Sequence, residues 1–342
     1  MNNEKLNEIS NIKAIMMLFI IVYHCIAIWM PGGWFIVRPG RQNIVLSSAA
    51  QWLNLIHIYV FTFASGYIYS VMRFERKHYP SLRSFLVKKI NRLIVPYVFV
   101  SIIWIIPFDV LFYRSSFNDI IYKYFLAYSP SQLWYVVMLF GIFVIVYMSG
   151  DVFYNINCSK ILFIFVVFEL LYALIGRYIS LPFQILAVIK FLPYFVWGMN
   201  GRIIDKVIND NGYLRLNTMI ILLHIASFIV YILNYGNVFW AKIMNLIAAN
   251  ICSATGIIIV FIIYNKIKNS KLLLSRSFKE LKVNSFQMYL FHQQVIWCII
   301  YEFYDKIPLF IVVLMSFVLS FSVSLILSKM LKKNKYIKSF LG

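Results

Sequence analysis

Long, nearly uninterrupted apolar runs constrain this sequence more than any other feature. A helix that crosses the hydrocarbon core of a bilayer needs about 20 mostly apolar residues, and the sequence contains about ten such runs. Because backbone N–H and C=O groups find no water inside lipid, each run is predicted to be a helix. The sequence therefore predicts an all-α integral membrane protein, a polytopic bundle of about ten transmembrane helices. The predicted spans are residues 12–30, 47–70, 93–113, 132–149, 160–178, 182–200, 216–234, 243–264, 285–302 and 308–328.

The composition agrees with a chain that has the bilayer as its solvent. Hydrophobic residues make up 62% of the 342 residues, and charged residues only 13%. A soluble domain of this size needs more polar surface to cover its core. No stretch between the runs is long enough for a separate soluble domain, so residues 1–342 are predicted to form one transmembrane domain. The four cysteines show no CxxC pairing, so neither a metal site nor a disulfide framework is expected.

The positions of the basic residues predict the orientation of the chain. Lys and Arg total 32 against 12 Asp and Glu, but they lie mainly in short loops, which argues against a nucleic-acid partner. One side carries most of them, and the positive-inside rule then places both termini in the cytoplasm. That side comprises Lys5, the segment 73–92, Lys160, the loop 202–215, the loop 266–282 and the tail 329–338. The other side has Arg38, Arg41, Arg114, Lys123, Arg177, Lys242 and Lys306.

Two ionisable residues, Lys13 and His24, share one face of the first apolar run. They are close to three helical turns apart, which separates them by about 16 Å along the helix axis. Lys13 is expected at the cytoplasmic surface and His24 beyond the middle of the helix. A cation at the surface with an imidazole below it suits a ligand that has an anionic head and a long reactive arm. The alternative is that Lys13 extends to lipid phosphate and His24 bonds to a neighbouring helix.

Further polar residues fall inside the apolar runs, namely His57, Glu169, Lys190, His224 and His292. Each histidine, and Glu169, is taken individually as an interhelical hydrogen-bonding residue rather than a catalyst. Together they predict a polar bundle interior, as expected for a cavity that holds a hydrophilic ligand.

A basic segment leads into the third apolar run and contains Lys89 and Arg92, followed by Pro96. These cations suit the phosphates of a nucleotide-containing donor, because arginine presents several N–H donors in a fixed fork. The alternative is that they bind lipid phosphate as topology anchors, as the other basic loops do.

Five segments in order along the chain resemble the acyltransferase-3 family of bacterial membrane O-acyltransferases. The family has a basic residue and a histidine in its first span, where this chain has Lys13 and His24. Lys13 stands where the family usually has arginine, so the charge is kept but the bidentate fork is not. The other similar segments are 61–67 with Ser65-Gly66, 92–97 with Pro96-Tyr97, 133–135 with Leu133-Trp134, and 285–292 with Tyr289-Leu290 and His292.

The resemblance implies an enzyme of the bacterial inner membrane that transfers an acyl group, by default acetyl, from cytoplasmic acyl-CoA. Acetyl-CoA is then a co-substrate, with no bound cofactor, and the acceptor is a sugar hydroxyl of a surface polysaccharide or its lipid-linked precursor. Lys13, Lys89 and Arg92 would hold the donor phosphates. His24 would act as the general base or carry the acyl group as a covalent relay. The alternatives are a transporter such as a flippase for lipid-linked sugars, and a glycan polymerase; the oligomeric state stays open.

Overall fold

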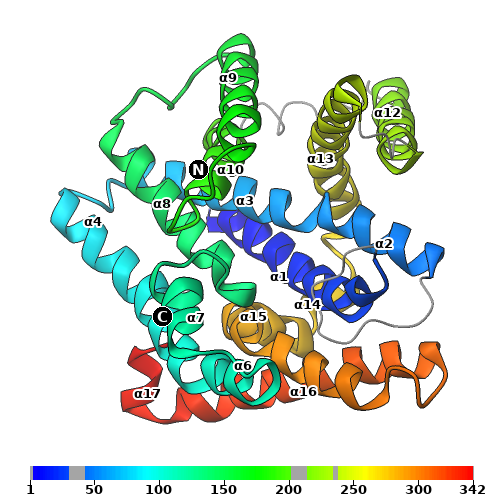
Figure 1. Ribbon diagram of the computed structural model, residues 1–342. Coiled ribbons are helices and arrows are strands. Elements are labelled where there is room, and N and C mark those ends of the chain that lie inside the picture. Colours follow the sequence, from blue (N-terminus) through cyan, green and yellow to red (C-terminus); the bar gives the residue numbers. More distant parts are fainter. Residues whose placement is uncertain (1–2, 31–42, 202–213, 234–237, 342) are drawn as a thin grey trace.

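The computed structural model describes residues 3–30, 43–201, 214–233 and 238–341, and these ranges are helical with no β-strand (Figure 1). Within them, eight helices are long and apolar enough to cross a membrane. The chain is therefore an all-α membrane protein. These helices span Asn3–Trp29, Ile44–Glu75, Leu82–Tyr113, Ser131–Met148, Cys158–Gly176, Arg215–Leu233, Phe239–Ile267 and Leu309–Lys333. Of the predicted loop cations, Arg38, Arg41, Arg202 and Lys206 lie outside the described residues.

Two of the ten predicted spans do not appear among those eight helices. The span 182–200 corresponds to α10 (Ile185–Met199), whose 15 residues extend for only about 22 Å. The span 285–302 lies in α15 (Arg276–Phe303), which is long enough to cross a membrane but more polar than the eight helices above. Its polar side chains include Gln287, His292 and Gln294, which are buried against other helices rather than turned toward lipid. A hydrophilic interior thus lowers the apolar signal of a helix without moving it out of the bundle.

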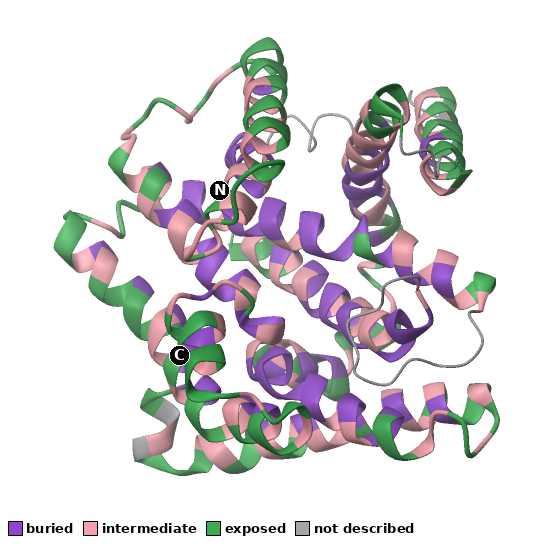
Figure 2. Ribbon diagram, in the orientation of Figure 1, coloured by how far each residue is buried: buried purple, intermediate pink, exposed green. Residues whose placement is uncertain are grey.

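Helix α1 (Asn3–Ile26) lies in the middle of the molecule. It contacts α2 (Ile44–Asn54), α3 (His57–Ser70), α15, and α16 (Leu309–Lys333). Figure 2 shows that buried residues concentrate on α1, α3 and α15. The helix that carries Lys13 and His24 is therefore surrounded by protein, which explains why it can keep polar side chains inside an apolar run.

Close backbone contact joins α3 to α10. A Cβ atom on Gly66 of α3 would lie 2.0 Å from the carbonyl oxygen of Phe195, and one on Gly198 of α10 would lie 2.0 Å from that of Phe63. Small residues allow helices in a membrane to approach this closely. The pair of glycines fixes α3, and with it His57 at its first turn, against α10.

The helix from Leu82 to Tyr113 is interrupted by two π-helical turns, Ile90–Ile94 and Ser101–Ile105, which separate α4 (Leu82–Lys89), α5 (Val95–Val100) and α6 (Ile106–Tyr113). Each π turn comes just before a proline, Pro96 or Pro107. Proline has no amide hydrogen for the helical ladder, and a widened turn absorbs the missing bond. Arg92 lies in the first of these turns.

The outer helices present apolar side chains to their surroundings. In the most apolar stretch of α9 (Cys158–Gly176) only 6% of the residues are buried, and in that of α12 (Leu214–Leu233) only 11%. The corresponding share for the first span is 61%. Figure 2 shows both helices largely exposed, as lipid-facing helices are expected to be. Helix α12 pairs with α13 (Phe239–Ile267). The remaining described α-helices are α7 (Phe117–Ile120), α8 (Trp134–Met148), α14 (Lys271–Leu274) and α17 (Lys335–Ser339).

Candidate functional site

Two histidines from distant parts of the sequence meet at the centre of the bundle. His24 near the end of α1 and His292 in the middle of α15 place Nδ1 and Nε2, respectively, 3.0 Å apart. The His292 side chain is fully buried. Sequence reasoning treated His292 as an interhelical hydrogen-bonding residue; the structure shows that its interhelical partner is His24.

The surrounding acceptors assign the proton positions of this histidine pair. Nδ1 of His292 lies 2.8 Å from the carbonyl oxygen of Tyr289 and 3.2 Å from that of Met288. Because a carbonyl oxygen only accepts, this Nδ1 carries the hydrogen, and Nε2 of the neutral ring is an acceptor. Nδ1 of His24 faces that acceptor and the carbonyl oxygen of Ile20, at 3.0 Å each. It therefore carries a hydrogen too, which makes Nε2 the basic nitrogen of His24.

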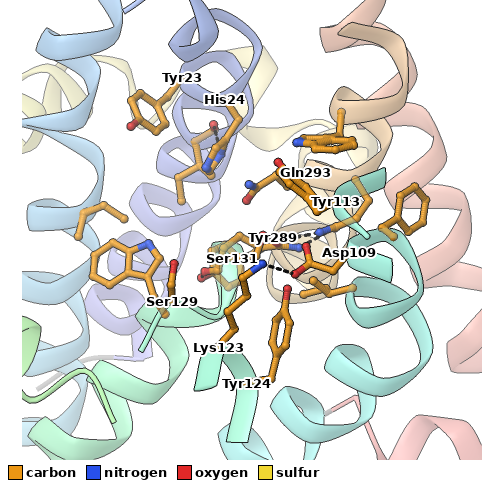
Figure 3. Close-up of a pocket in the computed structure, with 18 of the residues that line it drawn as sticks. Tyr23, His24, Asp109, Tyr113, Lys123, Tyr124, Ser129, Ser131, Tyr289 and Gln293 are labelled. Atoms are coloured by element: carbon orange, nitrogen blue, oxygen red, sulfur yellow. Dashed lines mark hydrogen bonds and ion pairs between the residues drawn. The ribbon is translucent and has the colours of Figure 1, made fainter. Parts of the chain in front are cut away.

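His24 lines a cavity of about 380 Å³, which we name the histidine cavity (Figure 3). Its walls combine aromatic rings with hydroxyl and amide groups, a mixture typical of sites for polar organic ligands. His57 also contributes to the wall, and its Nδ1 lies 2.5 Å from the carbonyl oxygen of Leu53. The other polar and aromatic lining residues include Tyr23, Ser129, Gln132, Trp134, Gln293 and Trp297.

An ion pair that the sequence reasoning missed lies in the wall of the histidine cavity. Lys123 Nζ is 2.9 Å from Asp109 Oδ2, and Lys123 also donates to Ser115 Oγ at 3.1 Å. The two side chains point toward each other across the cavity wall in Figure 3. Asp109 is an acidic residue inside the apolar run 93–113, and a charge at such a position calls for a partner. The sequence shows that Asp109 lies in an apolar run, but it does not show that Lys123 is the cation that pairs with it.

A second cavity, of about 490 Å³, gathers the predicted donor-binding residues Lys13, Lys89 and Arg92 into one wall; we name it the basic cavity. Lys88 and Lys282 line it as well. These cations come from α1, from the segment 88–92 and from α15, which are far apart in the sequence. In the sequence, Lys88 and Lys282 stood out only as two of the many cations in the basic loops.

Within the basic cavity, each predicted donor-binding residue has a different setting. Lys13 Nζ donates to Ser65 Oγ at 3.3 Å and lies 5.5 Å from the ring centre of Phe61. Lys89 is 7% exposed, with Nζ 3.6 Å from the ring centre of Phe143. Arg92 is exposed. Lys13 is half-buried and lies ten residues after the start of α1 at Asn3; its expected place at the membrane surface stays a prediction.

Tyr79 adds a neutral hydrogen-bonding group to the wall of the basic cavity. It lies in the loop between Glu75 and Leu82, and burial raises the pKa of its phenol above the ordinary value. The phenol therefore keeps its proton at physiological pH and can donate to an anion in the cavity.

The two cavities meet at three residues that line both, Ile20, Ile58 and Tyr289. The hydroxyl of Tyr289 donates to the carbonyl oxygen of Gln132, which ties α15 to the start of α8 at this junction. His24 is one helical turn beyond Ile20 on α1. A long ligand bound by the cations of the basic cavity could thus extend its far end past Ile20 to His24.

Among the residues that the structure describes, no group of three or more His, Cys, Asp or Glu side chains could hold a metal ion. His24 and His292 contact carbonyl oxygens and each other's rings, whereas His57 contacts the carbonyl oxygen of Leu53 and the ring of Tyr23.

Fold and site together define a polytopic membrane protein with two neighbouring cavities, one lined by histidines and the other by cations. The sequence model of the acyltransferase-3 family, described as an acyltransferase domain, matches residues 6–329. The chain therefore belongs to the acyltransferase-3 family and is a membrane acyltransferase. No curated protein and no solved structure matches it.

Proposed function

We propose that the protein transfers an acyl group, by default acetyl, from acyl-CoA to a sugar hydroxyl of a surface polysaccharide or its lipid-linked precursor. The observation that supports this most directly is that Ile20, Ile58 and Tyr289, close to His24, line both cavities. A donor in the basic cavity and an acceptor in the histidine cavity would meet there. Such a meeting point replaces a collision between two substrates by a fixed geometry.

In this proposal the basic cavity holds acyl-CoA by its phosphates. Lys13, Lys89 and Arg92 supply the positive charge, and Arg92 can form paired bonds to two phosphate oxygens. The cavity is also lined by Phe61, Leu139 and other apolar side chains, which suit the uncharged arm of the donor. In this arrangement the phosphates stay at the cations and the thioester end extends past Ile20 toward His24.

The transfer step assigns the general-base role to His24. Nε2 of His24 takes the proton of the acceptor hydroxyl as that oxygen attacks the thioester carbonyl carbon. The C–S bond then breaks, and the CoA thiolate takes the proton from Nε2. The products are the sugar ester and CoA with a free thiol, and His24 is neutral again. His292 holds the His24 ring in the required tautomer through the Nδ1–Nε2 bond of 3.0 Å.

Direct transfer is favoured over a covalent acyl-histidine. A relay is needed when donor and acceptor occupy separate sites, but here the two cavities share three wall residues. In this proposal the thioester end of the donor passes these residues and meets the acceptor beside His24.

We further propose that the chain crosses the bacterial inner membrane ten times, with residues 1–342 as one domain and both termini in the cytoplasm. The basic cavity contains Lys88, Lys89, Arg92 and Lys282, which belong to the loops that the positive-inside rule assigns to the cytoplasm. Cytoplasmic acyl-CoA would then enter at the basic end. Helix α10 is short for a full crossing, and thinning of the bilayer beside it accommodates the difference.

The experiment is a labelled transfer assay in membranes from the native host, with and without the protein. Acetyl-labelled acetyl-CoA is added, and label in the polysaccharide fraction is counted. The proposal predicts label that depends on the protein. If donor and glycan are both present and no protein-dependent label appears, the transferase proposal fails, and a flippase or a glycan polymerase replaces it.

A further inference from the structure

A third cavity, of about 370 Å³, adjoins the histidine cavity and is lined by Lys190. We name it the Lys190 cavity. It shares Asn54, Ile58 and Trp134 with the histidine cavity, so the two cavities are direct neighbours. Tyr59, Tyr172 and Gln184 complete its polar lining. The mechanism above gives no role to any residue that lines this cavity alone.

Lys190 is a charged residue in the middle of an apolar helix, and its ammonium group faces this cavity rather than lipid. Nζ lies 5.3 Å from the ring centre of Tyr172 and 5.8 Å from that of Phe191. Among the described residues, no carboxylate oxygen lies within 4.0 Å of it. The Tyr59 hydroxyl is a hydrogen-bond partner of Lys190. An ammonium group has three N–H donors, so the remaining donors suit a ligand that brings oxygen atoms into the cavity.

The nearby charge decides between a sugar and a phosphate as that ligand. Glu169 on α9 interacts electrostatically with Lys190, and both its carboxylate oxygens are buried with no hydrogen-bond partner among the described residues. Glu169 lies beyond ion-pair distance of Lys190, and its electrostatic interaction offsets part of the positive charge. A phosphate would meet that opposing charge, whereas sugar hydroxyls need only hydrogen-bonding groups and aromatic faces.

The walls are held in place, as a specific subsite requires. Gln184 Nε2 donates to the carbonyl oxygens of Ala127 and Tyr128 at 2.7 and 2.9 Å. Trp134 packs on Phe191, with ring centres 5.8 Å apart, and lines both the histidine cavity and the Lys190 cavity. An indole at the boundary offers an apolar surface to a sugar on either side of it.

We propose that the Lys190 cavity is a second acceptor subsite, which binds the sugar unit next to the one that is acylated. The acceptor is then an oligosaccharide of at least two units rather than a single sugar. This inference rests on the proposed transferase function and adds the length of the acceptor that the enzyme recognises.

The test uses the full-length protein in membranes and fragments of the host's own surface polysaccharide. The polysaccharide is stripped of its esters with mild base, partly hydrolysed, and separated into fragments of increasing length from a single unit upward. Transfer from labelled acetyl-CoA is measured for each length with wild type, Lys190→Met and Tyr172→Ala. Lys160→Met, an exposed lysine of α9 that lines none of the three cavities, is the matched control.

For wild type and the Lys160→Met control, kcat/KM is expected to rise about tenfold or more from one unit to two, which is the effect of one good added contact. Lys190→Met and Tyr172→Ala should lose that gain and keep the wild-type rate with a single unit. The retained single-unit rate also shows that the variants are folded.

Equal kcat/KM for one and two units in wild type, or a length gain that survives both variants, overturns the inference while the transferase stands. Transfer only to a fragment that carries a lipid diphosphate, lost in Lys190→Met and kept in Lys160→Met, would also overturn it and assign the cavity to phosphate. Failure of every fragment and of the intact polysaccharide to accept label counts against the transferase itself.

Discussion

At the residue scale, the site depends on a histidine pair whose second member has an orienting role. His292 accepts the Nδ1 hydrogen of His24, so His292→Ala removes the bond that fixes the basic nitrogen of His24. We expect kcat to fall by up to about 10²-fold, the effect of a small displacement of a catalytic group, with KM for acyl-CoA unchanged. His292→Gln, whose amide oxygen can also accept, should recover part of the rate. Steady-state kinetics of labelled acetyl transfer measures both; equal losses in the two variants would contradict the orienting role.

The basic cavity leads to a second prediction at this scale, which concerns donor binding. Arg92→Gln removes an exposed cation from the cavity wall without emptying a packed position. A lost charge-assisted hydrogen bond of about 1.5 kcal/mol or more raises KM for acyl-CoA by roughly tenfold. The difference in KM between the variant and wild type should diminish as salt is added, because salt screens the attraction between Arg92 and the donor phosphates. Titration of acyl-CoA at two salt concentrations checks this, and an altered kcat with normal KM would rule it out.

The sequence made some of these residues predictable and others not. Lys13, Lys89 and Arg92 stood out as charges next to or within apolar runs, and the structure places all three around one cavity. The pairing of His24 with His292 was not predictable, because a single sequence does not show which of several buried histidines meet. Asp109 and Lys123 were missed for the same reason.

At the scale of helices, the contact between α3 and α10 has no room for a side chain. A methyl group at Gly66 or Gly198 would lie 2.0 Å from a backbone carbonyl oxygen of the other helix. Gly66→Ala and Gly198→Ala should each destabilise the protein by about 1–3 kcal/mol or more, as overpacking does. Gly176→Ala is the control, because its nearest neighbour, Leu186 Cδ2, is 3.9 Å away. Thermal unfolding of the purified protein in detergent measures the three; a Gly66→Ala midpoint equal to that of Gly176→Ala would contradict the close packing.

Helix positions followed from the apolar runs wherever a helix faces lipid. Helices α9 and α12 match their predicted spans closely, since exposure to lipid demands an apolar residue at almost every position. Helix α15 is the opposite case, because its buried face is polar and its first residues belong to a basic loop. The sequence therefore located α15 but not its beginning, and it gave no indication of the two π turns before Pro96 and Pro107.

At the scale of the whole molecule, the proposed orientation places the basic cavity at the cytoplasmic end. Ser81, beside that cavity's loop, and Ser116, before α7, are both exposed and lie in loops assigned to opposite sides. In a chain whose native cysteines are replaced, Ser81→Cys should react with a membrane-impermeant maleimide only in inverted vesicles. Ser116→Cys should react in cells with a permeabilised outer layer. The reverse pattern would invert the topology and with it the side from which the donor enters.

The central claim is that His24 removes the proton from the acceptor where the two cavities join. The most direct test compares wild type with His24→Gln at matched amounts in host membranes, measuring acetyl transfer to polysaccharide together with binding of CoA. The account predicts that transfer falls by about 10²–10⁴-fold, the usual contribution of a general base, while CoA binds as in wild type because its cations are untouched. A loss of only a few fold, with CoA binding intact, would show that the chemistry does not depend on His24.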